Sequence, residues 1–304
     1  MKIAIVGAGG VGGYFGARLA AAGQDVGFVA RGKHLEALRS QGLVVRSPAG
    51  DLELSPVRAT ADPAELGEAD YVLVCVKTWQ LPEVITAIAP LVGDETAIVT
   101  VQNGVEAPDQ VAAVYGRGAV LPGAAEVIAY VDRPGIIRHL GYGKLSLGEW
   151  DNQPTPRTDR LRDAFIYAGL QATVPEDIWA GLWTKFLSIV PSGGLGTATG
   201  AGYGVLRSTP GTRRLLTEAT TEIRDVALAR GIALAADVVP RTLAWIDQLP
   251  ADGTTSLQRD LIAGRRSELE AWTGGVVRLG RESGVPTPVN TFLYELATAR
   301  AAAR

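Results

Sequence analysis

A glycine-rich stretch near the start of the chain contains the first residues whose spacing indicates chemistry. Residues 7–12, Gly-Ala-Gly-Gly-Val-Gly, follow the pattern G-x-G-x-x-G. In this pattern the first glycine permits a tight turn, the second lets a pyrophosphate approach the backbone, and the third lets helix and strand pack closely. The free N–H groups at the start of the helix then attract anions. The alternative is a glycine-rich turn in another α/β fold. The residues expected to hold the phosphates of a dinucleotide are Gly7, Gly9, Gly10, Val11 and Gly12.

A cationic residue follows the second expected strand, residues 25–30. Enzymes that use NAD usually carry Asp or Glu here, which accepts hydrogen bonds from the ribose 2′-hydroxyl. This chain has Arg31 instead, followed by Lys33 and His34. A guanidinium can bind a 2′-phosphate through two hydrogen bonds, whereas a carboxylate would repel it. Arg31 therefore favours NADP(H), and the alternative is a solvated arginine in a loop.

Two further polar residues come at or just after the ends of buried strands. Lys77 follows the apolar run 70–76, and Asn103 follows the apolar run 97–101. In open α/β sheets, ligands bind outside the carboxyl ends of the strands, so these residues and the glycine-rich turn are expected at one edge. The alternatives are a surface cation for Lys77 and a simple Asn-Gly turn at residue 103.

Three polar residues of the second half of the chain complete the candidate site. Lys185 lies on an expected aromatic helix, where apolar surroundings would lower its pKa and suit it to donate a proton. A snorkelling surface lysine is the equal alternative. Glu268 is the second candidate, and the alternative is that it belongs to a solvated charged face of the protein. Ser256 is the third, and the alternative is that it serves only as the N-cap of a helix.

The elements that must position these residues form two groups. Strands alternate with helices up to about residue 119, and the runs 120–130, 136–140 and 144–148 predict an antiparallel extension with turns at 132–135 and 141–143. From residue 175 the pattern is helical: 176–189, 212–230, 238–249, a helix from a T-x-x-Q capping box at 255 to about 274, and 290 to the end, with an irregular segment over 191–204. The sequence predicts a Rossmann-type α/β domain over 1–174 and an all-helical domain over 175–304.

Composition excludes several classes of protein. Of 304 residues, 47% are hydrophobic and the net charge is −3, which argues against disorder. The 29 basic residues do not exceed the 32 acidic ones, so nucleic acid is not an expected partner. No apolar run approaches the ~20 residues of a membrane span. One cysteine and two histidines make a metal site improbable, and the single thiol fits the reducing cytoplasm.

These motifs together resemble the ketopantoate reductase (2-dehydropantoate 2-reductase) family over essentially the whole chain. The resemblance implies reduction of a 2-oxo acid to a 2-hydroxy acid by NADPH, most simply ketopantoate to pantoate in pantothenate biosynthesis, with a homodimer left open. It places the catalytic lysine on Lys185, the active-site glutamate beside the cofactor on Glu268, and substrate contacts on Ser256, Asn103 and Lys185. It also matches Lys77, Arg31 and, on the nicotinamide side, Asn103 to cofactor contacts. The segments that carry it are IVGAGGVGGYFGARLA, VARGKHLEALR, VKTWQ, VQNGV, LWTKF, SLQRDLIAGRRSELE and GVVRLGRESGVPTPVN.

The chain departs from the family pattern at two positions. The family usually has substrate-contacting asparagines four and eight residues after the lysine, where this chain has Ile189 and Gly193. Each lost hydrogen bond can change the preference of the site for one substrate over another by ~1–3 kcal/mol. One alternative is therefore a reductase of a different 2-oxo or β-hydroxy acid. Another is an NADP(H)-binding sensor without turnover, against which the presence of both Lys185 and Glu268 argues.

Overall fold

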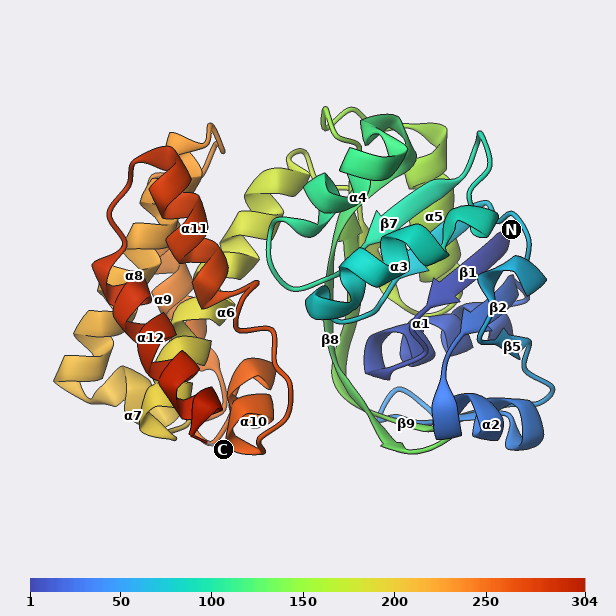
Figure 1. The fold of residues 1–304 in the computed structure, drawn as a ribbon, viewed down its shortest axis with the longest axis horizontal. Helices are drawn as coiled ribbons and strands as arrows, with labels where there is room; N and C mark the ends of the chain where they lie inside the picture. Colours follow the sequence, from blue (N-terminus) through green and yellow to red (C-terminus); the bar gives the residue numbers. More distant parts are fainter. Residues whose placement is uncertain (304) are drawn as a thin grey trace. The chain divides into compact units, whose positions relative to one another are not determined.

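The computed structural model describes residues 1–303 and divides them into two compact units (Figure 1). The sheet unit comprises Met1–Gln102 and Ala107–Ile178. The helical unit comprises the chain from Trp179 onward together with the short segment Asn103–Glu106. The domain limits derived from the sequence, 1–174 and 175–304, stay a prediction.

The sheet unit is built on parallel strands whose ends are aligned. Within residues 1–303 ten strands form one sheet in the order β4-β3-β9-β8-β7-β6-β1-β2-β5, and β10 pairs with β9. The register joins Val6 to Val29 and Val74, and Val74 to Thr100, so β1, β2, β6 and β7 end at one level. The strands are β1 (Lys2–Val6), β2 (Asp25–Val29), β3 (Leu43–Arg46), β4 (Leu52–Leu54), β5 (Ala59–Thr60), β6 (Tyr71–Val74), β7 (Ala97–Thr100), β8 (Val120–Arg133), β9 (Ile136–Leu147) and β10 (Gln171–Thr173).

Helices cover both faces of this sheet, which confirms the Rossmann-type α/β fold. Phe15 of α1 packs edge-on against Phe165 of α5, with ring centroids 5.2 Å apart, in the core on one face. Val84 of α3 and Val111 of α4 are buried in the core on the other face. The helices are α1 (Gly10–Ala21), α2 (Gly32–Gln41), α3 (Leu81–Ala87), α4 (Ala107–Tyr115) and α5 (Pro156–Tyr167), with short 3-10 turns η1 (Pro63–Glu65), η2 (Thr78–Gln80), η3 (Ala89–Leu91) and η4 (Arg117–Ala119).

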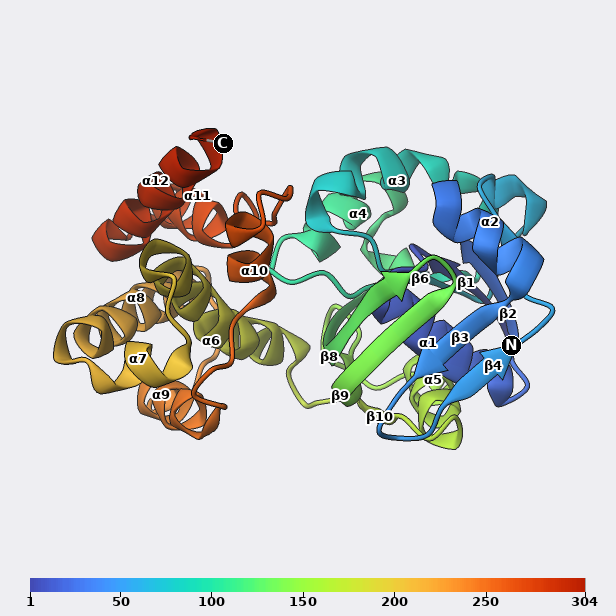
Figure 2. The ribbon, with the colours of Figure 1, turned by 90° about the horizontal axis from the view of Figure 1, so that it is seen from below.

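Two long antiparallel strands, β8 and β9, extend the sheet beside β3 and β4 (Figure 2). The turn predicted at 141–143 was wrong, because β9 runs through it as an irregular stretch. The ladder shifts register opposite this stretch, between Glu126 and Val127, and Tyr142 adopts a φ of 60°. The backbone oxygen of Tyr142 accepts a hydrogen bond from Nε2 of His139 at 2.9 Å. A β-bulge of this kind accommodates Gly141 and Gly143 without ending the strand.

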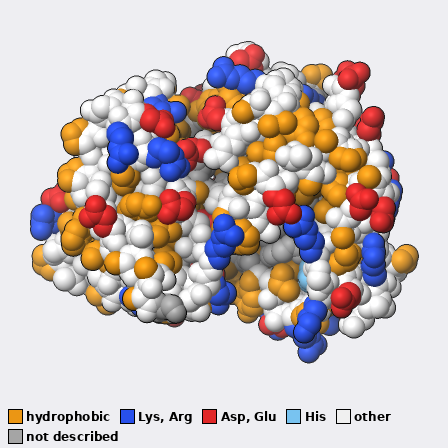
Figure 3. Space-filling model, in the orientation of Figure 1, with side chains coloured by type: hydrophobic (Ala, Val, Ile, Leu, Met, Phe, Trp, Pro, Cys, Tyr) orange, Lys and Arg blue, Asp and Glu red, His pale blue; other side chains and the backbone are white. Residues whose placement is uncertain are grey.

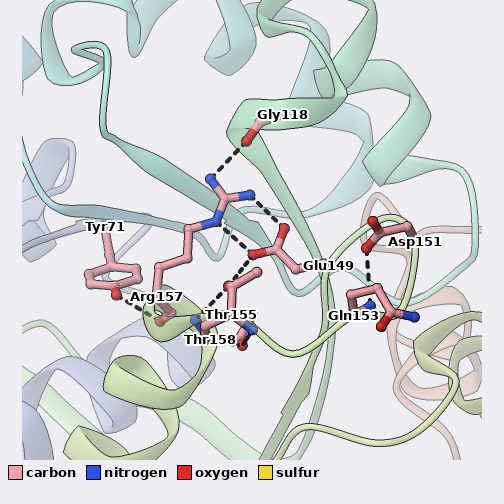
Figure 4. Close-up of polar contacts among 8 residues, drawn as sticks. All are labelled: Tyr71, Gly118, Glu149, Asp151, Gln153, Thr155, Arg157 and Thr158. Carbon is pink, nitrogen blue, oxygen red and sulfur yellow. Dashed lines mark hydrogen bonds and ion pairs between the residues drawn. The ribbon is translucent and has the colours of Figure 1, made fainter.

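An ion pair between the partly buried Arg157 and the buried Glu149 fixes the loop between β9 and α5 (Figure 4). Nε and Nη2 of Arg157 donate to the two carboxylate oxygens of Glu149 at 2.7 and 2.6 Å. The Arg157 Nη1 also donates to the backbone oxygen of Gly118 at 2.8 Å, and the Thr155 hydroxyl donates to Glu149. The Tyr71 hydroxyl donates to the Arg157 carbonyl at 2.7 Å. The Glu149 carboxylate thus holds the start of α5, and the Arg157 guanidinium joins it to the segment before β8.

Removing the Glu149 carboxylate should destabilise the sheet unit. Glu149→Ala leaves a partly buried guanidinium without its anion, and such a loss costs about 3 kcal/mol of unfolding free energy. The exposed pair of Arg46 with Glu53 is the control, because Glu53→Ala should cost at most ~1 kcal/mol. Denaturant unfolding followed by circular dichroism measures both. Equal losses in the two variants would show that the buried pair has no special weight.

The second unit is helical in its described part. Glu222 of α8 lies at the start of α12, where its carboxylate accepts hydrogen bonds from the backbone N–H groups of Val289 and Asn290 at 2.8 and 3.0 Å. It also accepts one from Nδ2 of Asn290 at 2.7 Å, which ties the two helices together. The helices are α6 (Ile178–Thr199), α7 (Tyr203–Ser208), α8 (Pro210–Ala229), α9 (Val238–Gln248), α10 (Ser256–Ile262), α11 (Thr273–Ser283) and α12 (Pro288–Ala302).

The irregular segment predicted over 191–204 was wrong for its first part, because α6 continues through Pro191 to Thr199. Three glycines allow this helix to approach its neighbours. A Cβ on Gly193 would lie 3.1 Å from Leu257 and Trp272, one on Gly194 would lie 3.1 Å from Leu293, and one on Gly196 would overlap the Gln258 amide. Close packing therefore outweighs the low helix propensity of glycine and proline.

The long helix predicted from 255 to about 274 was also wrong. The capping hydrogen bond is present, since the Thr255 hydroxyl accepts from the backbone N–H of Gln258 at 3.2 Å. The helix that it opens, α10, ends at Ile262, and Gly264 follows with a φ of +68°. The next helix, α11, begins only at Thr273. Glu268 therefore lies in a non-helical connection, and Ser256 is the first helical residue, not the N-cap.

The described helices include none that is long and apolar enough to cross a membrane. On the face shown in Figure 3, Lys and Arg side chains are interspersed with Asp and Glu side chains. This mixed surface accords with the small net charge of −3.

Candidate active site

The glycine-rich turn joins β1 to α1 and leaves one side of its backbone open. Gly7 has a φ of +100°, which favours glycine, and its N–H donates to the Val29 carbonyl at 3.0 Å. A Cβ on Gly12 would overlap the Gly7 carbonyl and lie 2.8 Å from Ile5, so helix and strand need this glycine to pack. Nothing lies within 4 Å of the position of a Cβ on Gly9, the N-cap of α1. A phosphate can therefore approach the helix N-terminus at Gly9.

Gly10 has a packing role that sequence reasoning missed. A Cβ at this position would overlap the backbone carbonyl of Ala129 in β8. The strand extension thus crosses directly against the first turn of α1. The close approach explains a glycine here without any ligand.

Arg31 is the N-cap residue of α2 and is already engaged by an anion of the protein. Its Nη1 lies 2.7 Å from Oε1 of Glu83, on α3. Both side chains are more than half exposed, at 58% and 62%. A 2′-phosphate bound to Arg31 would have to displace or share this carboxylate.

His34 connects the glycine-rich turn to the end of the β8–β9 hairpin, a role that its sequence position did not reveal. The Gly135 N–H donates to Nδ1 of His34 at 3.1 Å, so the proton lies on Nε2, which donates to the Ala8 carbonyl at 2.8 Å. Burial lowers the pKa of His34 below 6.5, and the bond to Ala8 opposes this in part. The half-buried ring is therefore neutral and fixed in one tautomer.

Acidification should weaken the fold through this histidine. The pKa of His34 is 6.5 in the unfolded chain and lower in the folded one. Its contribution to the free energy of unfolding is therefore complete above pH 6.5. Below pH 6.5 the unfolded chain binds a proton that the folded chain does not, so stability falls until the folded pKa is passed.

As the pH falls below 6.5, the melting temperature of His34→Gln should fall less steeply than that of the wild type. Burial also lowers the pKa of His139, and this residue contributes equally to the pH dependence of both proteins. Parallel curves for the two proteins would contradict the assignment.

Lys77 follows the end of β6 and is the N-cap residue of η2, where its backbone N–H donates to Oε1 of Gln80 at 3.3 Å. Gln102, which sequence reasoning passed over, fixes the same edge. Its side chain is 5% exposed, and its Nε2 donates to the carbonyls of Val74 and Val76 at 2.7 and 3.0 Å. This amide ties the end of β7 to the strand end that precedes Lys77.

The predicted cofactor residues fall into both units. The aligned ends of β1, β2, β6 and β7 bring Gly7, Arg31 and Lys77 to the carboxyl edge of the sheet unit. Asn103 directly follows the same edge in sequence but belongs to the helical unit. The expectation of one shared edge therefore stays a prediction for Asn103.

The helical unit brings together the segments that carry the other predicted residues. Lys185 is half-buried on α6, and Gly193 lies two turns further along, about 12 Å by helix rise. At Gly193 the helix contacts Leu257, which follows Ser256, and Trp272, which follows the connection that holds Glu268. Glu268 is 4% exposed.

The two departures from the family pattern have an apolar setting. Ile189 is half-buried, and the space beside Gly193 is filled by the Trp272 ring and the Leu257 side chain, each 3.1 Å from where a Cβ would stand. The indole Nε1 of Trp272 is buried and has no hydrogen-bond partner within residues 1–303. An asparagine at position 193 would require Trp272 to move.

Cys75 lies next to the glycine-rich turn, since its Cβ is 2.9 Å from where a Cβ on Gly12 would stand. Burial raises the pKa of Cys75 to about 12. The thiol is therefore protonated at neutral pH and unsuited to act as a nucleophile.

Comparisons with known proteins agree across both units. A family model described as ketopantoate reductase PanE/ApbA matches residues 3–152, and its C-terminal counterpart matches residues 177–301. A 2-dehydropantoate 2-reductase from Mesorhizobium japonicum is 35% identical, over 95% of this chain and 94% of the relative. An uncharacterized oxidoreductase from Bacillus subtilis is 28% identical over 97% of both chains.

Solved structures show the same likeness. A 2-dehydropantoate 2-reductase from Geobacter metallireducens has a TM-score of 0.92 and 31% identity, covering 98% of this chain and 99% of the other. A D-mandelate dehydrogenase solved with NADH has a TM-score of 0.89 at 24% identity, covering 100% of this chain and 99% of the other, which shows a shared fold alone. The chain thus belongs to the ketopantoate reductase family and is an oxidoreductase of that family.

Proposed function

We propose that this chain reduces a 2-oxo acid to the corresponding 2-hydroxy acid with NADPH, and that 2-dehydropantoate is the first substrate to test. The observation that carries the proposal is the match of both family models, which span the dinucleotide turn and the segments of Lys185, Ser256 and Glu268. The reaction would belong to pantothenate biosynthesis in the cytoplasm. The relative from Mesorhizobium japonicum bears the name of this activity.

The residues present fit a dinucleotide. The open side of Gly9 at the N-terminus of α1 leaves room for a pyrophosphate, and Arg31 would bind the 2′-phosphate in competition with Glu83. Lys77 would contact the cofactor further along the same sheet edge. When bound, the nicotinamide supplies the hydride.

The helical unit would supply the proton and the substrate contacts. The protonated Lys185 would stabilise negative charge on the substrate carbonyl oxygen and then deliver its proton there. Glu268 would orient Lys185 or the new hydroxyl group and contact the cofactor. Ser256 would bind the substrate, and Asn103 would position the substrate or the nicotinamide.

A second candidate is the same reaction on a more apolar 2-oxo acid. It is favoured by the contact of Gly193 with Trp272 and Leu257, where the family usually presents an amide. A pocket that lacks this amide loses its preference for a substrate hydroxyl there. 2-Dehydropantoate, with its branched and hydroxylated side chain, would then be a poorer substrate than an aromatic 2-oxo acid.

A panel of 2-oxo acids separates the candidates. Oxidation of NADPH is followed by absorbance with 2-dehydropantoate, benzoylformate and aliphatic 2-oxo acids. Highest kcat/KM for 2-dehydropantoate supports the first candidate, and highest kcat/KM for an apolar acid supports the second. Cofactor binding without turnover on every acid would refute both and indicate a sensor.

A further inference from the structure

The segment Asn103–Glu106 is held by the helical unit, although the chain on both sides of it belongs to the sheet unit. Gly104 has a φ of +113°, and a Cβ there would lie 3.3 Å from the carbonyl oxygen of Ala271. The backbone next to Asn103 thus rests on the connection that carries Glu268. This contact fixes one side of the segment.

A two-point ion pair fixes the other side. Nη2 of Arg278, on α11, lies 2.6 Å from Oε2 of Glu106, and Nε lies 3.2 Å from Oε1. Gly275, one turn earlier on α11, makes room for this carboxylate, because a Cβ there would lie 3.2 Å from Oε2. A guanidinium that makes two hydrogen bonds to one carboxylate fixes the orientation of that carboxylate as well as its distance.

We propose that Glu106 and Arg278 are positioning residues that set the location of Asn103 in the reaction, an inference that rests on the proposed function. Asn103 directly precedes Gly104 and lies three residues from Glu106, so the two contacts of this short segment bracket its backbone. The pair therefore determines where the Asn103 amide stands relative to Glu268 and Lys185, which belong to the same unit.

The exposure of the pair favours positioning over stability. Arg278 is 44% exposed and Glu106 is 23% exposed, and pairs of this kind add little to the free energy of unfolding. A displacement of about 1 Å in a group that orients reactants can nevertheless cost up to ~100-fold in rate. Loss of the pair should thus lower kcat far more than it lowers the melting temperature.

A double-mutant cycle of Arg278→Ala with Asn103→Ala tests this directly. In the wild-type background, Arg278→Ala should lower kcat about tenfold, with little change in the affinity for NADPH. In the Asn103→Ala background it should lower kcat less than twofold, because the group it positions is gone. Arg278→Lys, which keeps one bond, should give an intermediate kcat.

Arg230→Ala is the matched control, since it removes a comparable exposed pair with Glu282 on the same helix α11 and should leave kcat unchanged. Hydrogen exchange of the amides at 103–106 gives a readout that needs no turnover, and exchange should accelerate in Arg278→Ala but not in Arg230→Ala.

Equal effects of Arg278→Ala in both backgrounds, or unchanged exchange, would overturn the inference while leaving the proposed function intact. A wild-type protein that reduces no acid of the panel refutes the proposed function, and with it any catalytic meaning of the pair.

Discussion

Replacing Lys185 by alanine should lower kcat by about 10²–10⁴-fold while NADPH binds as before. A positioned proton donor contributes this much to a proton transfer, and Lys185 is the residue to which we assign that role. NADPH affinity, measured by fluorescence titration, should stay within about twofold because the expected phosphate contacts lie in the sheet unit. Steady-state kinetics on the working substrate measures kcat.

Two further variants show whether charge or proton matters. Lys185→Arg keeps a cation that does not deprotonate in proteins, so it should recover substrate binding better than kcat. Lys144→Ala removes a lysine that pairs with Glu126 at 3.5 Å and should leave kcat unchanged. Near-normal turnover of Lys185→Ala would remove this lysine from the mechanism.

Replacing Arg31 by alanine should abolish the preference for NADPH over NADH. A charge-assisted contact to the 2′-phosphate is worth about 1.5–3 kcal/mol, and the exposure of Arg31 places it near the lower figure, which is about tenfold in Kd. The Kd of NADH, which lacks that phosphate, should not change. Titration of both cofactors against both proteins measures the preference.

Glu83→Gln is the matched variant, and it should change the affinity for NADPH in the opposite direction. The Glu83 carboxylate lies 2.7 Å from Nη1 of Arg31 and competes with the 2′-phosphate for it. Removing its charge should tighten NADPH binding severalfold and leave NADH unchanged. Equal affinities for NADPH and NADH in the wild type would contradict the 2′-phosphate assignment and both expectations.

Most of the sheet unit could be predicted because its signals are local. The apolar runs before Lys77 and Gln102 predict buried strands, and the structure confirms β6 and β7 there. The glycine spacing predicts the tight turn and close packing that Gly7 and Gly12 show. Each of these inferences needs only residues that are neighbours in sequence.

The errors occur where long-range packing decides the backbone. Pro191 and the glycines after it indicate a loop, yet they form helix because Trp272, Leu257 and Leu293 leave no room for larger residues. The predicted helix over 255–274 overran Gly264, whose positive φ ends α10. The partners that settle these cases are up to about one hundred residues away in sequence.

The candidate site shows the same division. Residue types and motifs identified Arg31, Lys77 and Lys185 as candidates. The side chains that fix the backbone at this edge of the sheet unit, such as His34 on Ala8 and Gln102 on Val76, contact carbonyls that no local pattern reveals. Glu106 pairs with Arg278 across 172 residues of sequence, a contact that only the folded chain shows.

The most direct test of the proposed reaction follows one hydrogen atom. NADPH labelled with deuterium at nicotinamide C4 on the transferred side is incubated with the enzyme and its best 2-oxo acid, and the product is examined by mass spectrometry and NMR. We expect one deuterium at C2 of the 2-hydroxy acid for each NADPH oxidised, and almost none with Lys185→Ala over the same time. Oxidation of NADPH without deuterium at C2, or no 2-hydroxy acid from any substrate of the panel, would contradict the proposed reaction.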